Sequence, residues 1–178
     1  MPSNDDTRIR CEGCGALVPS IDGPTHRYLG ASPGCWALYG EVLAREYIGV
    51  QYSQRHQLTV DTYAAQHPGT PSPQSVQSVN VHLMSICAVL EFGHAPQQAM
   101  KLIQRAIAHS MDFSWLESPK SMGAITIVDV HAAKNPEAHE KIVREWAQSV
   151  WNAWGQHPET VRASVRILES SEGLSANC

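Results

Sequence analysis

The spacing of apolar residues along the chain predicts a protein built mainly from helices. In residues 96–111, Met100, Ile103 and Ile107 recur at three- and four-residue steps, which place them on one face of a helix. Similar periods, together with helix start and stop signals, predict helices over 35–48, 58–66, 75–92, 96–111 and 136–154, and a last short helix beginning at Pro158. The fold class we expect is mainly α, a compact bundle of about six helices.

Residues 75–92 differ from the other predicted helices because their apolar side chains surround most of the helix instead of forming a stripe. A helix that is apolar on nearly all sides is enclosed by protein. We therefore predict that this segment is the central helix, and that Cys87 within it is a small buried side chain.

Residues 125–130 are the one good strand candidate, although Thr126 could equally cap a short helix there. Residues 61–68 and 129–136 share an Asp, a pair of alanines and a closing proline at matching positions. This similarity favours two short helices, each ended by a proline.

Composition places the chain among globular proteins. Of its 178 residues, 43% are hydrophobic and 17% charged, which argues against disorder and against a coiled coil. We expect a flexible arm at 1–10, a single helical metal-binding domain at 11–168 and a polar tail at 169–178.

Net charge and hydropathy limit the kinds of partner that we expect this protein to bind. A net charge of -4 gives no basic face for nucleic acid. Residues 1–10 are too polar for a secretory signal, and the most apolar stretch, 76–92, is too polar to cross a bilayer. We expect a cytoplasmic protein that binds neither nucleic acid nor membrane, and whose partner is a small molecule or a second copy in a homodimer.

The clearest chemical signal is a group of cysteines near the N-terminus. Cys11 and Cys14 are two residues apart and Gly15 follows them, a spacing that aims both sulfurs at one point, as half of a tetrahedral zinc site requires. Cys35 follows the Pro33-Gly34 turn and is the natural third thiolate. His26, which lies between these two segments, is the fourth ligand we predict, and His67 or His82 could also reach the site.

Two other interpretations of the cysteines stay open. A redox dithiol usually lies between a strand and a helix in a strand–helix alternation, which this sequence does not show. The cysteines could also be unrelated free thiols. Zinc is favoured over iron because iron–sulfur spacings are missing from the sequence.

A second candidate site comprises Asp61, His67 and His82. His82 lies on the helix predicted to be most buried, and His67 precedes the helix-ending Pro68. Buried imidazoles need partners for both nitrogens, and Asp61 could orient either ring. We predict that these three residues face one interior cavity, with His26 pointing to the same side, and that they are catalytic. The alternative is that His67 and His82 are ordinary core histidines whose hydrogen bonds are satisfied.

Five other histidines and three tryptophans fit ordinary roles. His56, His94, His109, His139 and His157 fall on loops or polar helix positions, so we expect them at the surface. Trp146, Trp151 and Trp154 are expected to form part of the core and a seam between subunits.

Several longer motifs occur together in this chain, at residues 11–15, 23–28, 30–36, 58–69, 81–83 and 146–154. With them the chain resembles a small bacterial family catalogued as a domain of unknown function, over roughly residues 11–166. The resemblance implies no activity, but it implies which positions belong to the family pattern: Cys11, Cys14, His26, Cys35, Asp61, Gln66, His67 and His82. The family pattern also implies a proline inside the first cysteine pair, where this chain has Glu12-Gly13.

These observations predict a zinc-binding protein of unknown activity, whose zinc is held by the N-terminal cysteines. The alternative is a metalloenzyme that acts on a small molecule, with His67 or His82 as acid, base or ligand. The coordination shell separates the two, because a catalytic zinc keeps a position for water whereas a structural zinc has four protein ligands.

Overall fold

The computed structural model describes residues 7–49, 55–109 and 111–175, and within them the chain is mainly helical, as predicted. Two short strands precede the helices: β1 (Arg8–Arg10) and β2 (Leu17–Pro19). The helices are α1 (Pro33–Ile48), α2 (His56–Gln66), α3 (Pro73–Leu90), α4 (Pro96–Ala108), α5 (Ile127–Ala132), α6 (Pro136–Ala153) and α7 (Pro158–Ser175).

Local sequence signals account for most helix starts. Proline occupies the first turn of α1, α3, α4 and α6, where its missing N–H costs nothing. Asn135 caps α6 by accepting a hydrogen bond from the Ala138 N–H at 2.8 Å. Thr126 and Asp129 cap α5 reciprocally, so the ambiguous segment near residue 127 is a helix and not a strand.

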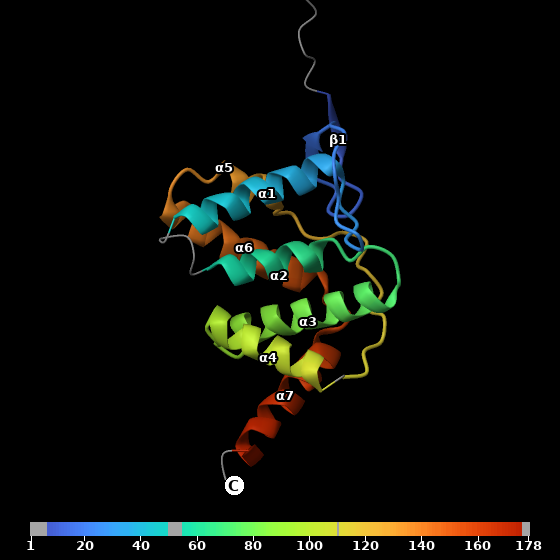
Figure 1. Cartoon of the computed structure of the whole chain (residues 1–178), viewed down its shortest axis with the longest axis vertical. Helices are drawn as coiled ribbons and strands as arrows, with labels where there is room; N and C mark the ends of the chain where they lie inside the picture. The colour runs from blue at the N-terminus through green and yellow to red at the C-terminus, as the bar shows by residue number, and fades with distance from the viewer. Residues whose placement is uncertain (1–6, 50–54, 110, 176–178) are drawn as a thin grey trace, which may run out of the picture.

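The helices stack in layers along the long axis of the molecule (Figure 1). From β1 downward, α1 lies beside α5, α2 beside α6, and α3 between α2 and α4, while α7 packs on α3 and α4 at the opposite end. The prediction of a central helix is confirmed, because twelve of the side chains of α3 are buried. Among the described residues, no helix is both long and apolar enough to cross a membrane.

Both predicted chain ends need correction. Arg8–Arg10 is not part of a flexible arm, since it pairs antiparallel with Leu17–Pro19; residues 1–6 lie outside the described residues. The last helix is also longer than expected, because α7 continues to Ser175 and so includes the first part of the predicted polar tail. Val161, Val165 and Leu168 recur every three or four residues and are buried, so this helix is long and anchored on the core.

The tryptophans of α6 and its end are core residues rather than a subunit seam. Trp146, Trp151 and Trp154 are all buried within this one chain. Each indole N–H has a partner: Gln66 Oε1 at 2.9 Å, Glu91 Oε1 at 2.8 Å and the Ala65 carbonyl at 3.0 Å, respectively. They therefore tie α6 to α2 and to the end of α3.

Candidate metal centre

The first two sulfurs are brought together by the turn between β1 and β2. Cys11 directly follows β1, and its carbonyl accepts a hydrogen bond from the Gly15 N–H at 2.9 Å. Gly15 has a φ of +75°, a conformation in which glycine avoids the steric cost of a side chain. The Cys11 N–H then bonds to the Ala16 carbonyl at 2.8 Å, which closes the turn. Cys11 and Cys14 thus lie on a rigid hairpin loop.

The other two donors come from helix ends. Cys35 is in the first turn of α1. Strand β2 packs closely against this turn, since a Cβ at Gly34 would lie 2.1 Å from the Pro19 carbonyl oxygen. His67 is the residue that ends α2, with φ of -128° and ψ of 61°. Its carbonyl accepts a hydrogen bond from the Gly30 N–H at 3.2 Å, which holds the N-terminal loop against the end of α2.

Cys11, Cys14, Cys35 and His67 form a compact donor set. Their sulfur and nitrogen atoms all lie within 4.8 Å of one another. The Cys14 and Cys35 sulfurs are 3.9 Å apart, and the Cys35 sulfur is 3.4 Å from His67 Nε2. A tetrahedral zinc with bonds of about 2.3 Å to sulfur and about 2.0 Å to nitrogen needs separations of roughly 3.8 Å and 3.5 Å between such donors. The four side chains therefore fit one metal ion.

Neighbouring groups orient these donors. His67 Nδ1 lies 2.8 Å from the Tyr63 carbonyl, so it donates its proton there and Nε2 faces the sulfurs. The Ser32 N–H and the Tyr63 hydroxyl donate to the Cys11 and Cys35 sulfurs, each at 3.5 Å. Donors placed around sulfur stabilise negative charge on it.

Cys11, Cys35 and His67 share protons with their neighbours in the cluster. Hydrogen bonds from Cys14 and Cys35 hold the pKa of Cys11 far below that of an ordinary thiol, whereas the hydrogen bonds with Cys11 and Cys14, helped by burial, raise the pKa of Cys35. Burial lowers the pKa of His67, but its hydrogen bonds with Cys11 and Cys14 outweigh burial and raise it to about 9. A divalent cation at the centre would replace these shared protons.

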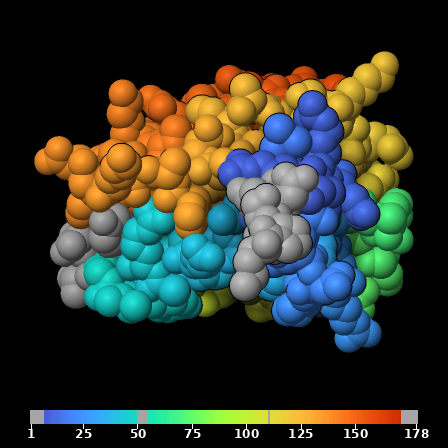
Figure 2. All heavy atoms as spheres, turned by 90° about the horizontal axis from the view of Figure 1, so that it is seen from above, coloured from blue at the N-terminus to red at the C-terminus, as the bar shows by residue number. Residues whose placement is uncertain are grey.

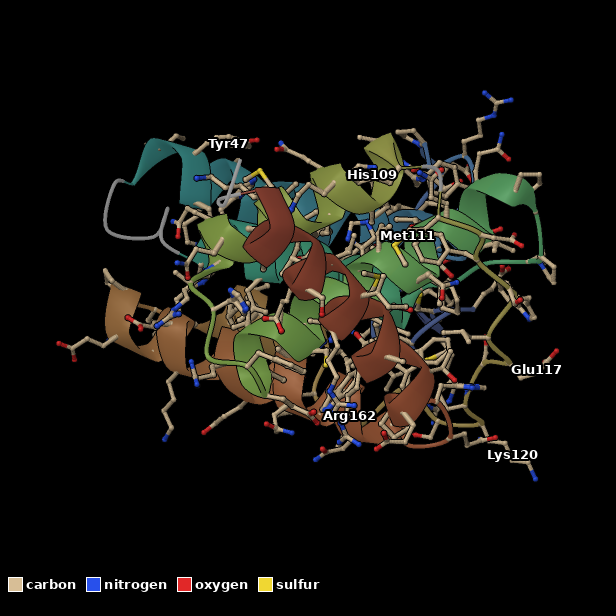
Figure 3. The ribbon with its side chains drawn as sticks, turned by 90° about the horizontal axis from the view of Figure 1, so that it is seen from below. Tyr47, His109, Met111, Glu117, Lys120 and Arg162 are labelled. Atoms are coloured by element: carbon tan, nitrogen blue, oxygen red, sulfur yellow. The ribbon has the colours of Figure 1, made fainter. Side chains whose placement is uncertain are left out.

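The cluster borders an open depression of about 670 Å³. Figure 2 shows the N-terminal segment in blue beside the yellow loop that precedes α5 and the green start of α3. Cys11 and Cys14 line the depression together with Gly69 and Lys120. The Lys120 side chain extends outward from the molecule (Figure 3). Solutes in water can therefore approach the cluster from this side.

His26, predicted as the fourth ligand, is not in the donor set. Its ring lies 4.4 Å from that of Tyr28 and 5.2 Å from that of Trp36, measured between centroids, and burial lowers its pKa. His67 takes the position beside the thiols. The reason is the long-range contact between the N-terminal loop and the end of α2, which a reading of nearby residues does not reveal.

The second predicted site is divided by the structure. Asp61 and His82 form a pair, with 2.7 Å between Oδ1 and Nδ1, and His82 lines a separate cavity with His26. His67 belongs to the cysteine cluster instead. The prediction that His67 and His82 share one cavity is therefore wrong, while the pairing of His82 with Asp61 and the shared cavity of His82 with His26 are found.

One buried polar cluster was not predicted. Glu46 is fully buried on α1 and lies 2.8 Å from His139 Nε2 and 2.8 Å from His56 Nδ1, while the Thr59 hydroxyl donates to it at 2.6 Å. His139 is 1% exposed, so its prediction as a surface residue is wrong. A signal was available, because His139 precedes Val143 and Trp146 at the spacing of the buried face of α6.

The fold and this donor set define a helical protein with a candidate Cys3His metal centre. The chain belongs to DUF5946, a family of unknown function, whose family model matches residues 9–155. The predicted membership of a family of unknown function is thereby confirmed. No curated protein matches the chain significantly. No solved structure does so either.

Proposed function

We propose that this protein binds one zinc ion through Cys11, Cys14, Cys35 and His67, and that the zinc is structural. The observation that supports this most directly is the set of four donors within 4.8 Å of one another, at separations that suit a tetrahedron. Three thiolates and one imidazole form a common shell of structural zinc sites.

Zinc is the metal that fits this donor set best. Zinc has no geometric preference from its d electrons and accepts a tetrahedral shell of sulfur and nitrogen. An iron–sulfur cluster spreads its ligands over two or more iron atoms, so ligands on different irons lie farther apart than the 4.8 Å within which all four of these donors fall. A disulfide would need sulfurs about 2.05 Å apart.

A structural role is favoured because the four protein donors complete the shell. A catalytic zinc keeps one position for water or substrate. The ligands here also come from three separate segments: the β1–β2 turn, the start of α1 and the end of α2. Zinc would therefore fix residues 15–34, which run between Cys14 and Cys35, against both helices.

We place the protein in the cytoplasm, a reducing compartment that keeps such thiolates available to metal. The four cysteines among the described residues are free thiols: Cys11, Cys14, Cys35 and Cys87. Fractionation of cells that express the chain should recover it with the cytoplasmic fraction, and recovery from a secreted or membrane fraction would contradict this assignment.

The experiment is elemental analysis and X-ray absorption on protein purified without chelators. We expect about one zinc per chain with three sulfur and one nitrogen ligands. His67→Ala should lose zinc, whereas the matched variant His26→Ala should keep it. Metal-free protein, or zinc retained by His67→Ala and lost by His26→Ala, would overturn the ligand assignment. A water molecule in the zinc shell would overturn the structural role.

A further inference from the structure

A separate cavity of about 170 Å³ lies between the N-terminal loop, α1, α2 and α3. One wall is aromatic and includes His26, Tyr28, Trp36 and Tyr39. These rings support one another: the Trp36 and Tyr39 centroids are 5.3 Å apart, and Tyr39 stacks on Tyr63 at 3.8 Å with an interplanar angle of 9°. The wall is therefore rigid and offers flat faces to a planar ligand.

His82 supplies a polar group on the side of α3. Its Nδ1 must donate to Asp61, because the carboxylate already accepts from Ser85 Oγ at 2.5 Å and from Gln57 Nε2 at 2.9 Å. Asp61 is fully buried and fixes the ring. Among the described residues, His82 makes its hydrogen bond through Nδ1 and none through Nε2, so Nε2 is available to a ligand.

Ser78 supplies a second polar group. It lies four residues before His82, on the same face of α3, and it lines the same cavity. Ser78 is 6% exposed, and its hydroxyl is buried without a hydrogen-bond partner among the residues that the structure describes. A buried hydroxyl without a partner is unfavourable, and a ligand that bonds to it removes the penalty.

We infer that this cavity binds a small planar aromatic molecule that carries one hydroxyl group. Such a hydroxyl would donate to His82 Nε2 and accept from the Ser78 hydroxyl, which satisfies both groups with one ligand atom. The ring would lie against Trp36 and Tyr39. A cavity of about 150 Å³ accommodates benzene, so 170 Å³ holds one six-membered ring with a substituent. This binding site lies beyond the zinc function proposed above and needs no metal at the ligand.

The experiment is a titration of the zinc-containing full chain with phenol, followed by protein NMR and calorimetry. Benzene and cyclohexanol are the comparison ligands, since one lacks the hydroxyl and the other the planar ring. We expect saturable binding of phenol, and binding at least about fivefold weaker for either comparison ligand, which corresponds to the loss of one hydrogen bond or of ring stacking.

Two variants test the two polar contacts, and a third is the control. Ser78→Ala should weaken phenol binding by about 2–10-fold. His82→Asn keeps a donor for Asp61 but removes Nε2, and should weaken binding by a similar factor. His94→Asn is the matched control. His94 lies away from this cavity and pairs with Glu169, with 2.6 Å between Nε2 and Oε1. This variant should bind phenol as the unaltered chain does.

The outcomes separate this inference from the zinc proposal. Zinc content measured in each sample should stay at one per chain, including in Ser78→Ala and His82→Asn. Phenol binding by a chain that lacks zinc would leave the inference standing and overturn only the zinc proposal. Failure of phenol to saturate the protein, equal binding of phenol and benzene, or unchanged binding by both variants would overturn the inference.

Discussion

His67 donates from Nδ1 to the carbonyl oxygen of Tyr63, 2.8 Å away and one turn earlier in α2. The ring is thereby fixed with Nε2 toward Cys35. Tyr63 also donates its hydroxyl to the Cys35 sulfur, and its ring stacks on that of His67 with centroids 4.1 Å apart. One tyrosine therefore positions two of the proposed zinc ligands, and burial raises its pKa well above the ordinary value, so the hydroxyl stays a donor.

Removal of zinc should lower the stability of the fold. A ligand that binds the folded chain at one hundred times its dissociation constant stabilises it by about 2.7 kcal/mol. Chelation should therefore lower the free energy of unfolding by at least about 2.7 kcal/mol, measured by denaturant titration before and after dialysis against a chelator. Zinc should restore the loss and magnesium should not. Equal stability of the two forms would contradict a structural role.

Gly13→Ala should disrupt the metal centre although Gly13 supplies no ligand. A Cβ at this position would lie 2.2 Å from the Gly30 carbonyl oxygen and 2.6 Å from His67 Cδ2. The loop or the His67 ring must then move, and changes next to metal ligands typically weaken metal binding by about 10–100-fold. Competition with a chromogenic chelator measures this loss.

Gly40→Ala is the matched control for that variant. Gly40 lies on the exposed side of α1, and a Cβ there would meet nothing within 4 Å. This variant should keep its zinc affinity and gain about 0.5–1 kcal/mol in stability, because alanine loses less backbone freedom in a helix. A similar loss of zinc in both variants would contradict the role given to Gly13.

Glu46→Ala should be among the most destabilising single changes in α1. The substitution leaves His139, His56 and Thr59 without their shared acceptor in a buried site. A buried polar group that loses its partner costs about 1–3 kcal/mol, and three groups lose an acceptor here. Glu41→Ala, in the same helix, removes the exposed partner of His131 and should cost under about 1 kcal/mol. Urea unfolding of both variants tests the contrast, and equal losses would count against it.

Local signals explain how much of this molecule could be read from its sequence. Pro33 and the Cys11–Gly15 turn act within a few residues, so the start of α1 and the cysteine pair were predictable. The Thr126–Asp129 capping box is equally local and settles α5 as a helix. The spread of apolar side chains around most of residues 75–92 likewise identified α3 as central.

The fourth donor and the division of the second site depend on contacts between distant segments. His67 reaches the thiols because Gly30 and Gly69 pack backbone against backbone, such that a Cβ at Gly30 would lie 3.2 Å from Gly69 Cα. Spacing along the chain carries no information on this approach, and it favoured His26 instead. His139 lies on the apolar stripe of α6, so its burial could have been predicted from its spacing. The prediction of a surface position rested instead on its polar side chain.

Glu91→Gln should weaken the attachment of α7 and reduce the effect of acid on stability. Glu91 follows the last residue of α3 and accepts a bidentate pair of hydrogen bonds from Arg162, with Nε to Oε2 at 2.6 Å and Nη2 to Oε1 at 2.7 Å. Trp151 Nε1 donates to the same carboxylate at 2.8 Å, so one side chain joins α3, α6 and α7. Arg162 is seen on α7 in Figure 3.

These contacts set the direction of the pH dependence. The hydrogen bonds from Arg162 outweigh burial and, with Trp151, hold the pKa of Glu91 below its ordinary value of 4.5. The unfolded chain therefore takes up a proton at this residue at a higher pH than the folded chain does. The stabilisation is fully present above about pH 4.5 and is lost as the pH falls through the lower pKa of the folded state.

Glu91→Gln should thus lower the melting temperature at pH 7 and show a smaller further drop between pH 5 and pH 3 than the unaltered chain. Glu159→Gln, which removes an exposed partner of the same arginine, is the control and should leave both quantities nearly unchanged. Thermal unfolding followed by circular dichroism across this pH range measures the difference, and parallel curves for Glu91→Gln and the unaltered chain would show that Glu91 does not carry this share of the acid response.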